Sequence, residues 1–260
     1  MPADQSAAAR SGEVRFAGVR FTPMTVDEAV RAIDARDPAA PFGVVVTPNA
    51  EHVYLTRRTP ELGVVGETAY VSTNDSRILH RAAKFAGINL KIAPGSDITP
   101  RPFAEVVRPD DPLTVVGATP ALIEELRVKY GLTRMVQHVP PMGFIRDPEA
   151  VQAAVDFVAA NPARFIFVAM GPPQSEQFCN RVAVDGRSTG LALCIGSSLS
   201  QLVGVLEPAP RWMTMAGMIW LHRLLKEPRR LWRRYLVNDM IALGWCIRDI
   251  VAIRLGLRRL

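Results

Sequence analysis

The sequence predicts an α/β fold, in which helices cover both faces of a mainly parallel sheet, followed by a C-terminal basic amphipathic helical appendage. Short runs of Val, Ile, Phe and Leu alternate with longer helical patterns, and apolar strands separated by helices form parallel sheets that are buried on both faces. The 260 residues are 48% hydrophobic and 22% charged. These are ordinary globular values, which exclude a disordered or fibrous chain.

The alternation of patterns predicts the elements in order. The expected strands are 14–21, 43–47, 70–72, 113–117, 135–139, 165–170 and 191–195. The expected helices are 25–35, 50–57, 75–86, 119–130, 148–160 and 173–184. Thr25 with Glu28 fits a capping box, and Asp147 fits an N-cap that precedes a proline at the first helical position. The whole is Rossmann-like, so ligands are expected outside the carboxyl ends of the strands.

The chain divides into three predicted parts: a flexible N-terminus (1–13), an α/β catalytic core (14–207) and a C-terminal helical arm (208–260). The start of the chain has no apolar stretch typical of a signal peptide. Three widely spaced cysteines, Cys179, Cys194 and Cys246, form neither a disulfide framework nor a zinc cluster. This usage favours a reducing compartment.

Charge is concentrated at one end of the chain. The net charge is +6, from 31 basic and 25 acidic residues. Residues 211–260 hold eleven Lys or Arg and three acids, a local +8, which leaves 20 basic and 22 acidic residues, a net −2, for the rest. A basic terminal segment points to a polyanionic partner such as nucleic acid, an anionic membrane or phosphates.

The arm alternates arginines with Leu, Trp and Tyr. In the apolar stretch that follows the arginine-rich segment and ends at 255, the longest uncharged run, 240–247, is far shorter than the roughly 20 residues that span a bilayer. A cationic segment of this kind is typical of a helix lying on a membrane surface. A helix packed on the domain with a solvated arginine face has the same pattern, and the residues alone do not separate the two.

Four loops after predicted strands have both a functional and a structural interpretation. In 47–52, backbone N–H groups at a helix start suit a phosphate or sugar, yet Asn49 also fits a plain N-cap. In 72–76, Asp75 fits a general base or another N-cap. The small residues of 170–176 and 195–200 allow either ligand approach or close packing.

Several chemistries are absent from the sequence. No dinucleotide-binding G-x-G-x-x-G, no P-loop and no G-x-S-x-G elbow is present. The four histidines, His52, His80, His138 and His222, are scattered without metal-ligand spacing. No metal site is therefore assigned.

Five segments resemble motifs that occur together in one known family, and the motifs are written first as that family has them. They are T-x-N-x-E after the second strand, an aspartate about one helix and one strand later (placed by counting back from Gly87), T-G-S-D-L, G-x-P-x-x-E, and A-P-x-W-M followed by L-x-R-L-x-x-E-P-x-R-L-x-x-R-Y. Here they stand as Thr47, Asn49 and Glu51; Asp75; Pro94, Gly95, Ser96, Asp97 and Ile98; Gly171, Pro173 and Glu176; and residues 209–213 with 221–235.

Together these segments resemble the WecG/TagA/CpsF glycosyltransferases (glycosyltransferase family 26) of bacterial surface-polysaccharide synthesis, from about Val14 to about Arg234. The long arm motif is the most specific. Departures surround the expected donor pocket. Asn74 and Ser76 flank the aspartate, and the basic residue before T-G-S-D moves to Lys91. The glutamine expected next to Glu176 is shifted or lost, with Ser175 in its place, and Ser200 replaces an aspartate. They leave the donor sugar open.

The resemblance implies transfer of a sugar from a UDP-sugar to a polyprenyl-diphosphate-linked sugar, with inversion at the anomeric carbon. Family donors are UDP-N-acetylmannosamine, its uronic acid and UDP-glucose, and the products are exopolysaccharide, capsule or teichoic acid. It implies no cofactor and no metal. It also implies a peripheral enzyme at the cytoplasmic face of the bacterial inner membrane, with an anionic lipid surface as partner, and it allows a homo-oligomer.

Roles for individual residues follow from the same resemblance. Asp75 is expected to be the catalytic base, and Thr47 and Asn49 to position sugar or acceptor hydroxyls. Arg223, Arg230 and Arg233 are expected to bind diphosphate oxygens, since guanidinium groups pair with them in bidentate fashion. The remaining expected substrate-binding residues are Gly95, Ser96, Asp97, Gly171, Pro173 and Glu176.

Three alternatives stay open. The departures allow a non-catalytic homologue that serves as a membrane-surface scaffold, although Asp75 is kept. A nucleic-acid-binding tail predicts binding with a steep salt dependence, but the arginines alternate with aromatic residues suited to a lipid interface and the core is slightly acidic. Another nucleotide-sugar enzyme on the same kind of sheet is disfavoured by the missing dinucleotide motif.

Overall fold

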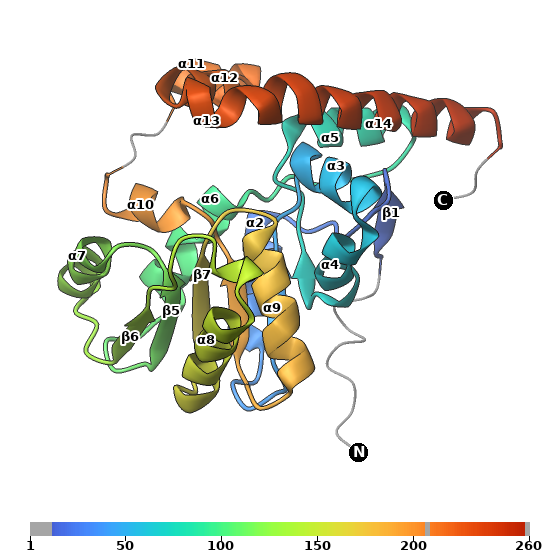
Figure 1. Cartoon of the computed structure of the whole chain (residues 1–260). Helices are drawn as coiled ribbons and strands as arrows, with labels where there is room; N and C mark the ends of the chain where they lie inside the picture. The colour runs from blue at the N-terminus through green and yellow to red at the C-terminus, as the bar shows by residue number, and fades with distance from the viewer. Residues whose placement is uncertain (1–11, 206–208, 258–260) are drawn as a thin grey trace.

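The computed structural model describes residues 12–205 and 209–257. Its centre is a six-stranded, all-parallel sheet in the order β4-β3-β8-β7-β5-β6 (Figure 1). The strands are β3 (Gly43–Val46), β4 (Val71–Ser72), β5 (Leu113–Gly117), β6 (Met135–His138), β7 (Phe165–Ala169) and β8 (Leu191–Cys194). The predicted α/β class and the six parallel strands are confirmed.

Both faces of this sheet are buried, because successive strand residues point to opposite sides. In β7, Phe165 and Phe167 belong to one core cluster, together with Ile33 of α2, while Ile166 and Val168 belong to a second, together with Phe178 of α9. This double burial explains why the strands are continuous apolar runs rather than alternating ones.

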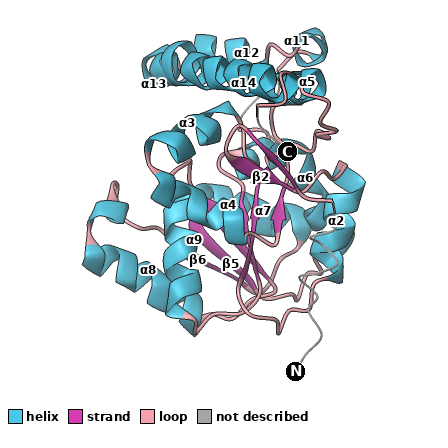
Figure 2. Ribbon diagram, turned by 90° about the vertical axis from the view of Figure 1, so that its right-hand side faces the viewer, coloured by secondary structure: helices cyan, strands magenta, loops and turns pink. Residues whose placement is uncertain are grey.

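Helices cover the two faces and connect the strands (Figure 2). They are α2 (Val26–Ala35), α3 (Ala50–Arg58), α4 (Val64–Thr68), α5 (Arg77–Phe85), α6 (Gly95–Ile98), α7 (Pro120–Tyr130), α8 (Pro148–Ala160), α9 (Gln174–Asp185) and α10 (Ser198–Leu202), with short turns η1 (Pro60–Gly63), η2 (Pro102–Val106) and η3 (Phe144–Arg146). The Thr25–Glu28 capping box and the Asp147 N-cap are confirmed.

The predicted strand 14–21 is wrong as a single strand. It forms a two-stranded antiparallel hairpin outside the main sheet, β1 (Val14–Phe16) and β2 (Val19–Phe21). The chain reverses at Ala17 and Gly18, which both have positive φ, 54° and 87°. Positive φ at both central residues gives the turn geometry that matches the twist of a hairpin. Alanine rarely adopts positive φ, so the turn signal at these two residues is weak.

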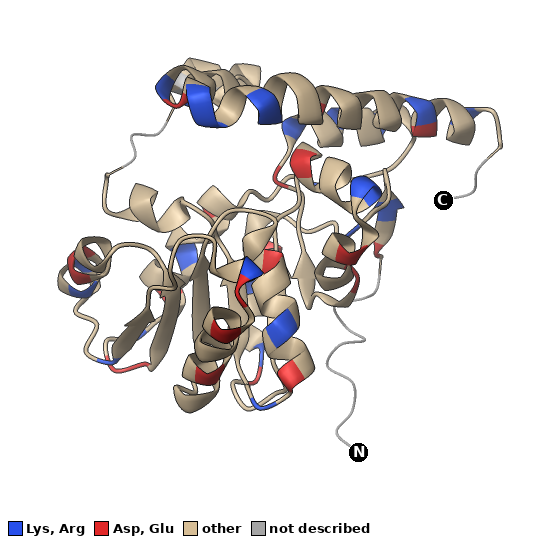
Figure 3. Cartoon of the chain, in the orientation of Figure 1, with Lys and Arg blue, Asp and Glu red and all other residues tan. Residues whose placement is uncertain are grey.

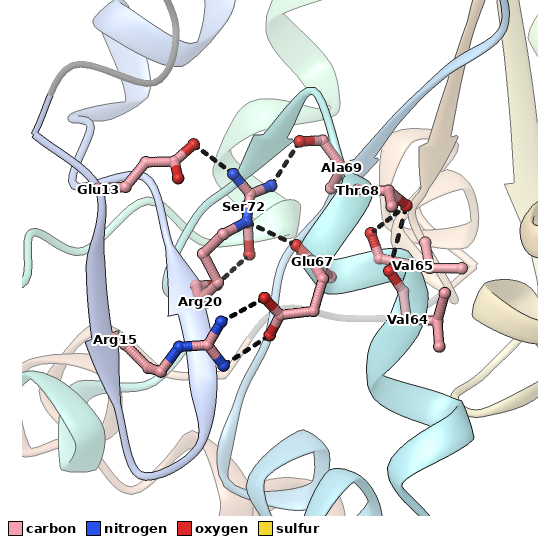
Figure 4. A network of polar contacts seen from close by, with 10 residues as sticks. Glu13, Arg15, Arg20, Val64, Val65, Glu67, Thr68, Ala69 and Ser72 are labelled. Carbon is pink, nitrogen blue, oxygen red and sulfur yellow. Dashed lines mark hydrogen bonds and ion pairs between the residues drawn. The ribbon is translucent and has the colours of Figure 1, made fainter.

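The hairpin is anchored beside β4 (Figure 4). The buried Arg20 donates through Nε to the Gly66 carbonyl at 2.9 Å and forms an ion pair with Glu13. The Ser72 hydroxyl donates to the Arg20 carbonyl at 2.7 Å, and the Thr22 amide donates to the Ser72 carbonyl at 2.7 Å. These bonds fix the carboxyl end of β4, from which the chain continues to Asp75.

The C-terminal arm lies across the carboxyl ends of the strands (Figure 1). It consists of α11 (Arg211–Ala216), α12 (Ile219–Lys226), α13 (Pro228–Arg233), η4 (Arg234–Asn238) and α14 (Asp239–Arg254). Ala242 and Cys246 of α14 are fully buried in a cluster with residues of α3, α5 and the hairpin. The ring of Trp245 stacks on Tyr54 at 5.9 Å.

An ion pair between Arg57 and Asp249 joins α3 to α14, and Arg254 Nε donates to the Phe85 carbonyl at 2.8 Å. The opposite side of α14 carries exposed apolar side chains at 240, 247, 251 and 255, spacings of 7, 4 and 4 that place them on one stripe. Figure 3 shows that much of α14 is uncharged. The helix thus buries one apolar face on the core and presents another outward.

The predicted N-terminus and the predicted boundary between 207 and 208 fall largely outside the described residues, so the division into three parts stays a prediction. Within the described ranges, no helix is both long and apolar enough to cross a bilayer.

Candidate active site

Loops after five parallel strands line one cavity of about 760 Å³. They follow β3, β4, β5, β7 and β8, and the arm contributes the facing wall through η4 and α12 to α14. Because parallel strands bring their carboxyl ends to one edge, the loops converge there, as predicted. The predicted site residues that line the cavity are Thr47, Asn49, Asp75, Gly95, Ser96, Asp97, Gly171, Glu176, Arg223 and Arg230. Pro173 and Arg233 do not line it.

The loop after β3 joins a helix cap to the cavity. The Asn49 side-chain oxygen accepts from the Glu51 amide at 3.0 Å, so the N-cap interpretation is confirmed, and the same residue faces the cavity. The Asn49 amide donates to Nδ1 of His52 at 3.2 Å. This leaves His52 Nε2 to donate to Glu176 Oε1, 3.0 Å away. His52 and Glu176 therefore tie the start of α3 to the start of α9.

Asp75 reaches the cavity because Ser76, not Asp75, caps the next helix. The Ser76 hydroxyl accepts from the Leu79 amide at 3.2 Å, and α5 begins at Arg77, so the predicted helix start at 75 is wrong by two residues. Asn74 bends the chain here: its side-chain oxygen accepts from the Ser76 amide at 2.9 Å. The Asp75 amide donates to the Pro48 carbonyl at 2.9 Å, which joins the β3 and β4 loops.

The surroundings of Asp75 raise its pKa from 3.8 to about 7. Burial is the largest cause, because protein replaces the water that would solvate the ionised carboxylate. Arg223, His52 and Arg234 act in the opposite direction, and Asp97 raises the pKa a little further. A carboxyl group that titrates near neutrality and faces a cavity is suited to take up a proton from a substrate.

Gly95 of α6 lies against Thr47. A β-carbon on Gly95 would be 3.0 Å from the Thr47 hydroxyl oxygen, closer than most real contacts of this kind. Next to it, the Ser96 hydroxyl donates to the Asp97 carboxylate at 3.2 Å. The glycine at this motif position thus keeps the Thr47 hydroxyl in its place on the cavity wall.

The loop after β7 contributes Gly171 and the first turn of α9 contributes Glu176, and the Pro172–Pro173 peptide bond between them is cis. Burial alone would raise the pKa of Glu176, but the hydrogen bonds from His52 and Ser175 outweigh it and hold the pKa below its ordinary value. Glu176 is therefore an ionised acceptor that orients His52. Pro173 precedes α9 and lies outside the cavity lining.

The arm brings arginines over the cavity, in a different set from the predicted one. Arg223, Arg230 and Arg234 line the cavity, whereas Arg233 is exposed to solvent. Arg230 is paired with Glu227, and Arg234 with Glu51 of α3, Nε to Oε2 at 2.7 Å. The spacing of four between 230 and 234 is the signal that could have found Arg234, because residues four apart share a helix face.

Asp239 also lines the cavity, and sequence reasoning missed it. In the described part of the chain, no group of three or more His, Cys, Asp or Glu side chains is arranged to hold a metal ion.

A comparison with known protein families identifies the family of this chain. Residues 14–255 match the Glycosyl transferase WecG/TagA/CpsF family. The chain belongs to this family. The match extends past Arg234, where the motif resemblance ended, and includes nearly all of the described arm. Membership of the WecG/TagA/CpsF family makes the chain a glycosyltransferase of cell-surface polysaccharide synthesis, and the cavity holds the motif residues.

Proposed function

We propose that this cavity transfers a sugar from a UDP-sugar to a polyprenyl-diphosphate-linked sugar, with inversion and without a metal ion. The observation that carries the proposal is the position of Asp75: a carboxyl group with its pKa raised to about 7, at the carboxyl edge of the sheet, facing arm arginines across a cavity of about 760 Å³. Family membership supports the sugar-nucleotide donor and the lipid-linked acceptor in general.

Asp75 acts as the base in this reaction. Its carboxylate takes the proton from the acceptor hydroxyl as that oxygen bonds to the anomeric carbon, while the bond from that carbon to the UDP oxygen breaks on the opposite side. Thr47 and Asn49, which line the same wall, orient sugar hydroxyls. The Asp75 amide donates to the Pro48 carbonyl, which joins the two loops that carry these three residues and favours one reactive geometry.

Arginines stabilise the departing UDP. Arg223 and Arg230 face the cavity from the arm, and so does Arg234, which lines the cavity where Arg233 was expected to do so. Cations fixed where negative charge develops stabilise a transition state, and loss of one such group typically costs on the order of 10²–10³ in rate. Arg233 has no part in this proposal, since its side chain points to solvent.

Exposed apolar side chains of the arm support a membrane-surface location. Trp212 of α11 and Trp232 of α13 are 62% and 51% exposed, and Ile247 of the outer stripe of α14 is 54% exposed. Apolar and aromatic side chains of this kind settle into the headgroup region, and nearby basic residues add attraction to anionic lipids. We propose that the arm holds the enzyme at the cytoplasmic face of the inner membrane, where the lipid-linked acceptor is found.

A donor panel tests the proposal. Purified full-length protein in vesicles receives a polyprenyl-diphosphate-linked sugar and, in separate reactions, several UDP-sugars, with and without EDTA. We expect acceptor-dependent UDP release for one donor, unchanged by EDTA, and an inverted anomeric configuration in the product by NMR. UDP binding without turnover for every donor and acceptor tested would favour the scaffold alternative, and a loss of turnover with EDTA would contradict metal independence.

A further inference from the structure

Asp239 lines the cavity from the arm, and the reaction proposed above gives it no role. It is the first residue of α14, and its neighbours Met240 and Leu243 line the same cavity. Its carboxyl group therefore faces whatever occupies the arm side of the cavity, while Asp75 lies on the core side, before α5.

One oxygen of Asp239 lacks a partner within the described residues. Oδ1 is buried from solvent and accepts no hydrogen bond there. The charged groups around it are Arg234, Glu51 and His52. Arg234 is already paired with Glu51 at 2.7 Å, so the nearest cation is shared with another carboxylate. Burial raises the pKa of Asp239 to about 7. Glu51 adds to this effect, whereas Arg234 and His52 lower the pKa. Buried acceptors are almost always bonded. A small turn of the carboxyl group would bring Oδ1 to the cavity that Asp239 lines, where a bound molecule would supply the missing donor.

The part of the cavity beside Asp239 opens to an apolar surface. Ile219, Leu236 and Met240 line the cavity and are also exposed, at 40%, 53% and 57%. These three residues form an apolar rim, and the rim continues into the outer stripe of α14 at 247, 251 and 255. A molecule with a hydrocarbon tail would enter here, because its tail stays against apolar side chains while its polar end enters the cavity.

Charge decides which part of such a molecule meets Asp239. A carboxyl oxygen next to Glu51 repels phosphate and carboxylate groups, whereas the arginines Arg223 and Arg230 attract them. A hydroxyl or amide N–H group is a donor without negative charge, and both are abundant on sugars. The buried oxygen therefore fits the sugar portion of a lipid-linked substrate rather than its diphosphate.

We propose that Asp239 binds the sugar of the lipid-linked acceptor, with Oδ1 accepting a hydrogen bond from a sugar hydroxyl or amide N–H. The inference rests on the proposed function, since it takes the lipid-linked acceptor as substrate, and it adds the residue of the arm that recognises the acceptor sugar.

Equilibrium binding without turnover tests it. The probes are farnesyl diphosphate and farnesyl diphosphate linked to glucose or to N-acetylglucosamine, with UDP as the probe of the nucleotide site. The variants are Asp239→Ala, which removes the acceptor oxygen, and Asp239→Asn, which keeps one. Asn238→Ala is the matched control, because Asn238 is the neighbouring residue and does not line the cavity. Thermal melting of each variant verifies the fold.

We expect wild type to bind a sugar-linked lipid about tenfold or more tightly than farnesyl diphosphate, as a hydrogen bond to a carboxyl group allows. Asp239→Ala should lose most of that preference and keep its affinity for farnesyl diphosphate and UDP, Asp239→Asn should keep part of it, and Asn238→Ala all of it. An Asp239→Ala variant that keeps the preference, or a wild type without one, would overturn the inference. A wild type that binds UDP but no lipid would overturn the lipid-acceptor part of the proposed function itself.

Discussion

The Asp75 carboxyl group faces the cavity because the side chains of its two neighbours make the hydrogen bonds that shape the loop. Ser76 caps α5 and Asn74 bonds to the Ser76 backbone, so the carboxyl group between them is left to face the cavity. The two residues that depart from the family's pattern beside the aspartate, Asn74 and Ser76, thus hold it in position. At the level of single residues, the substitutions around Asp75 are compatible with a working base.

The pH dependence of the rate tests the environment of Asp75. Its pKa is about 7, and only the ionised form takes a proton, so kcat/KM should fall as the pH drops below about 7. Arg223 lowers this pKa, so Arg223→Gln should move the midpoint of the fall in kcat/KM to higher pH, while Arg223→Lys, which keeps the charge, should leave the midpoint nearly unchanged. The same fall should be seen in Asp239→Asn. A midpoint that does not move in Arg223→Gln would contradict this account.

Gly95 gives a second test at the residue scale. In Gly95→Ala, the new methyl group would be 3.0 Å from the Thr47 hydroxyl oxygen and would displace it. We expect kcat/KM to fall roughly tenfold or more, since small displacements of positioning groups are costly. Gly244→Ala is the control, because a β-carbon there meets nothing within 4 Å. Equal activity of the two variants would show that Thr47 need not be held in place.

At the scale of elements, the arm is joined to the core by side chains that the core buries. Asp249 is 3% exposed and pairs with Arg57 of α3. Ala242 and Cys246 complete the contact with α3 and α5. Since α3 begins directly after Asn49 and α5 begins two residues after Asp75, the docking of α14 fixes the arm relative to the catalytic loops.

Breaking this ion pair should loosen α14. Asp249→Ala leaves the charge of Arg57 buried without its carboxylate, a change that costs about 3–5 kcal/mol in comparable pairs. We expect faster amide hydrogen exchange in α14, with exchange in β5 and β7 nearly unchanged. Arg248→Gln, at an exposed position next to it, should exchange like wild type. Unchanged protection of α14 in Asp249→Ala would mean that the pair does not hold the arm.

The elements also show how far sequence reasoning reaches. The parallel strands were predictable because they are apolar on both faces, and the longer helices because of their caps and periodicity. The hairpin was missed because its turn uses Ala17 at positive φ. Arg234 could have been found from its spacing of four from Arg230. Asp239 was missed because its position depends on contacts between distant parts of the chain, such as the pair of Arg234 with Glu51.

At the scale of the whole molecule, the arm lies across one end of the sheet (Figures 1 and 2). The cavity and the exposed apolar stripe of α14 belong to the same end. The described residues 211–257, which hold nine Lys or Arg and three acids, a local +6, belong to the same end. A membrane on this side would contact the stripe and the basic residues while the opening beside Met240 remains next to the lipid.

Vesicle flotation tests this orientation. Wild type should float with vesicles of phosphatidylglycerol and phosphatidylcholine, less so at high salt, because salt screens the basic residues. Trp232→Glu and Ile247→Glu should reduce flotation and leave UDP affinity unchanged. Val128→Glu is the control: Val128 is 77% exposed on α7 of the core. Equal loss in all three variants would place the lipid contact elsewhere.

The central claim is that Asp75 is the base of a transferase, and the most direct measurement compares wild type with Asp75→Asn in single-turnover transfer at matched UDP occupancy. A buried carboxyl with a raised pKa costs stability once the pH is above its ordinary value, so the variant should melt no lower than wild type at pH 8. We predict unchanged UDP affinity and a rate that falls by about 10²–10⁴. A well-folded variant that transfers at the wild-type rate would contradict the account.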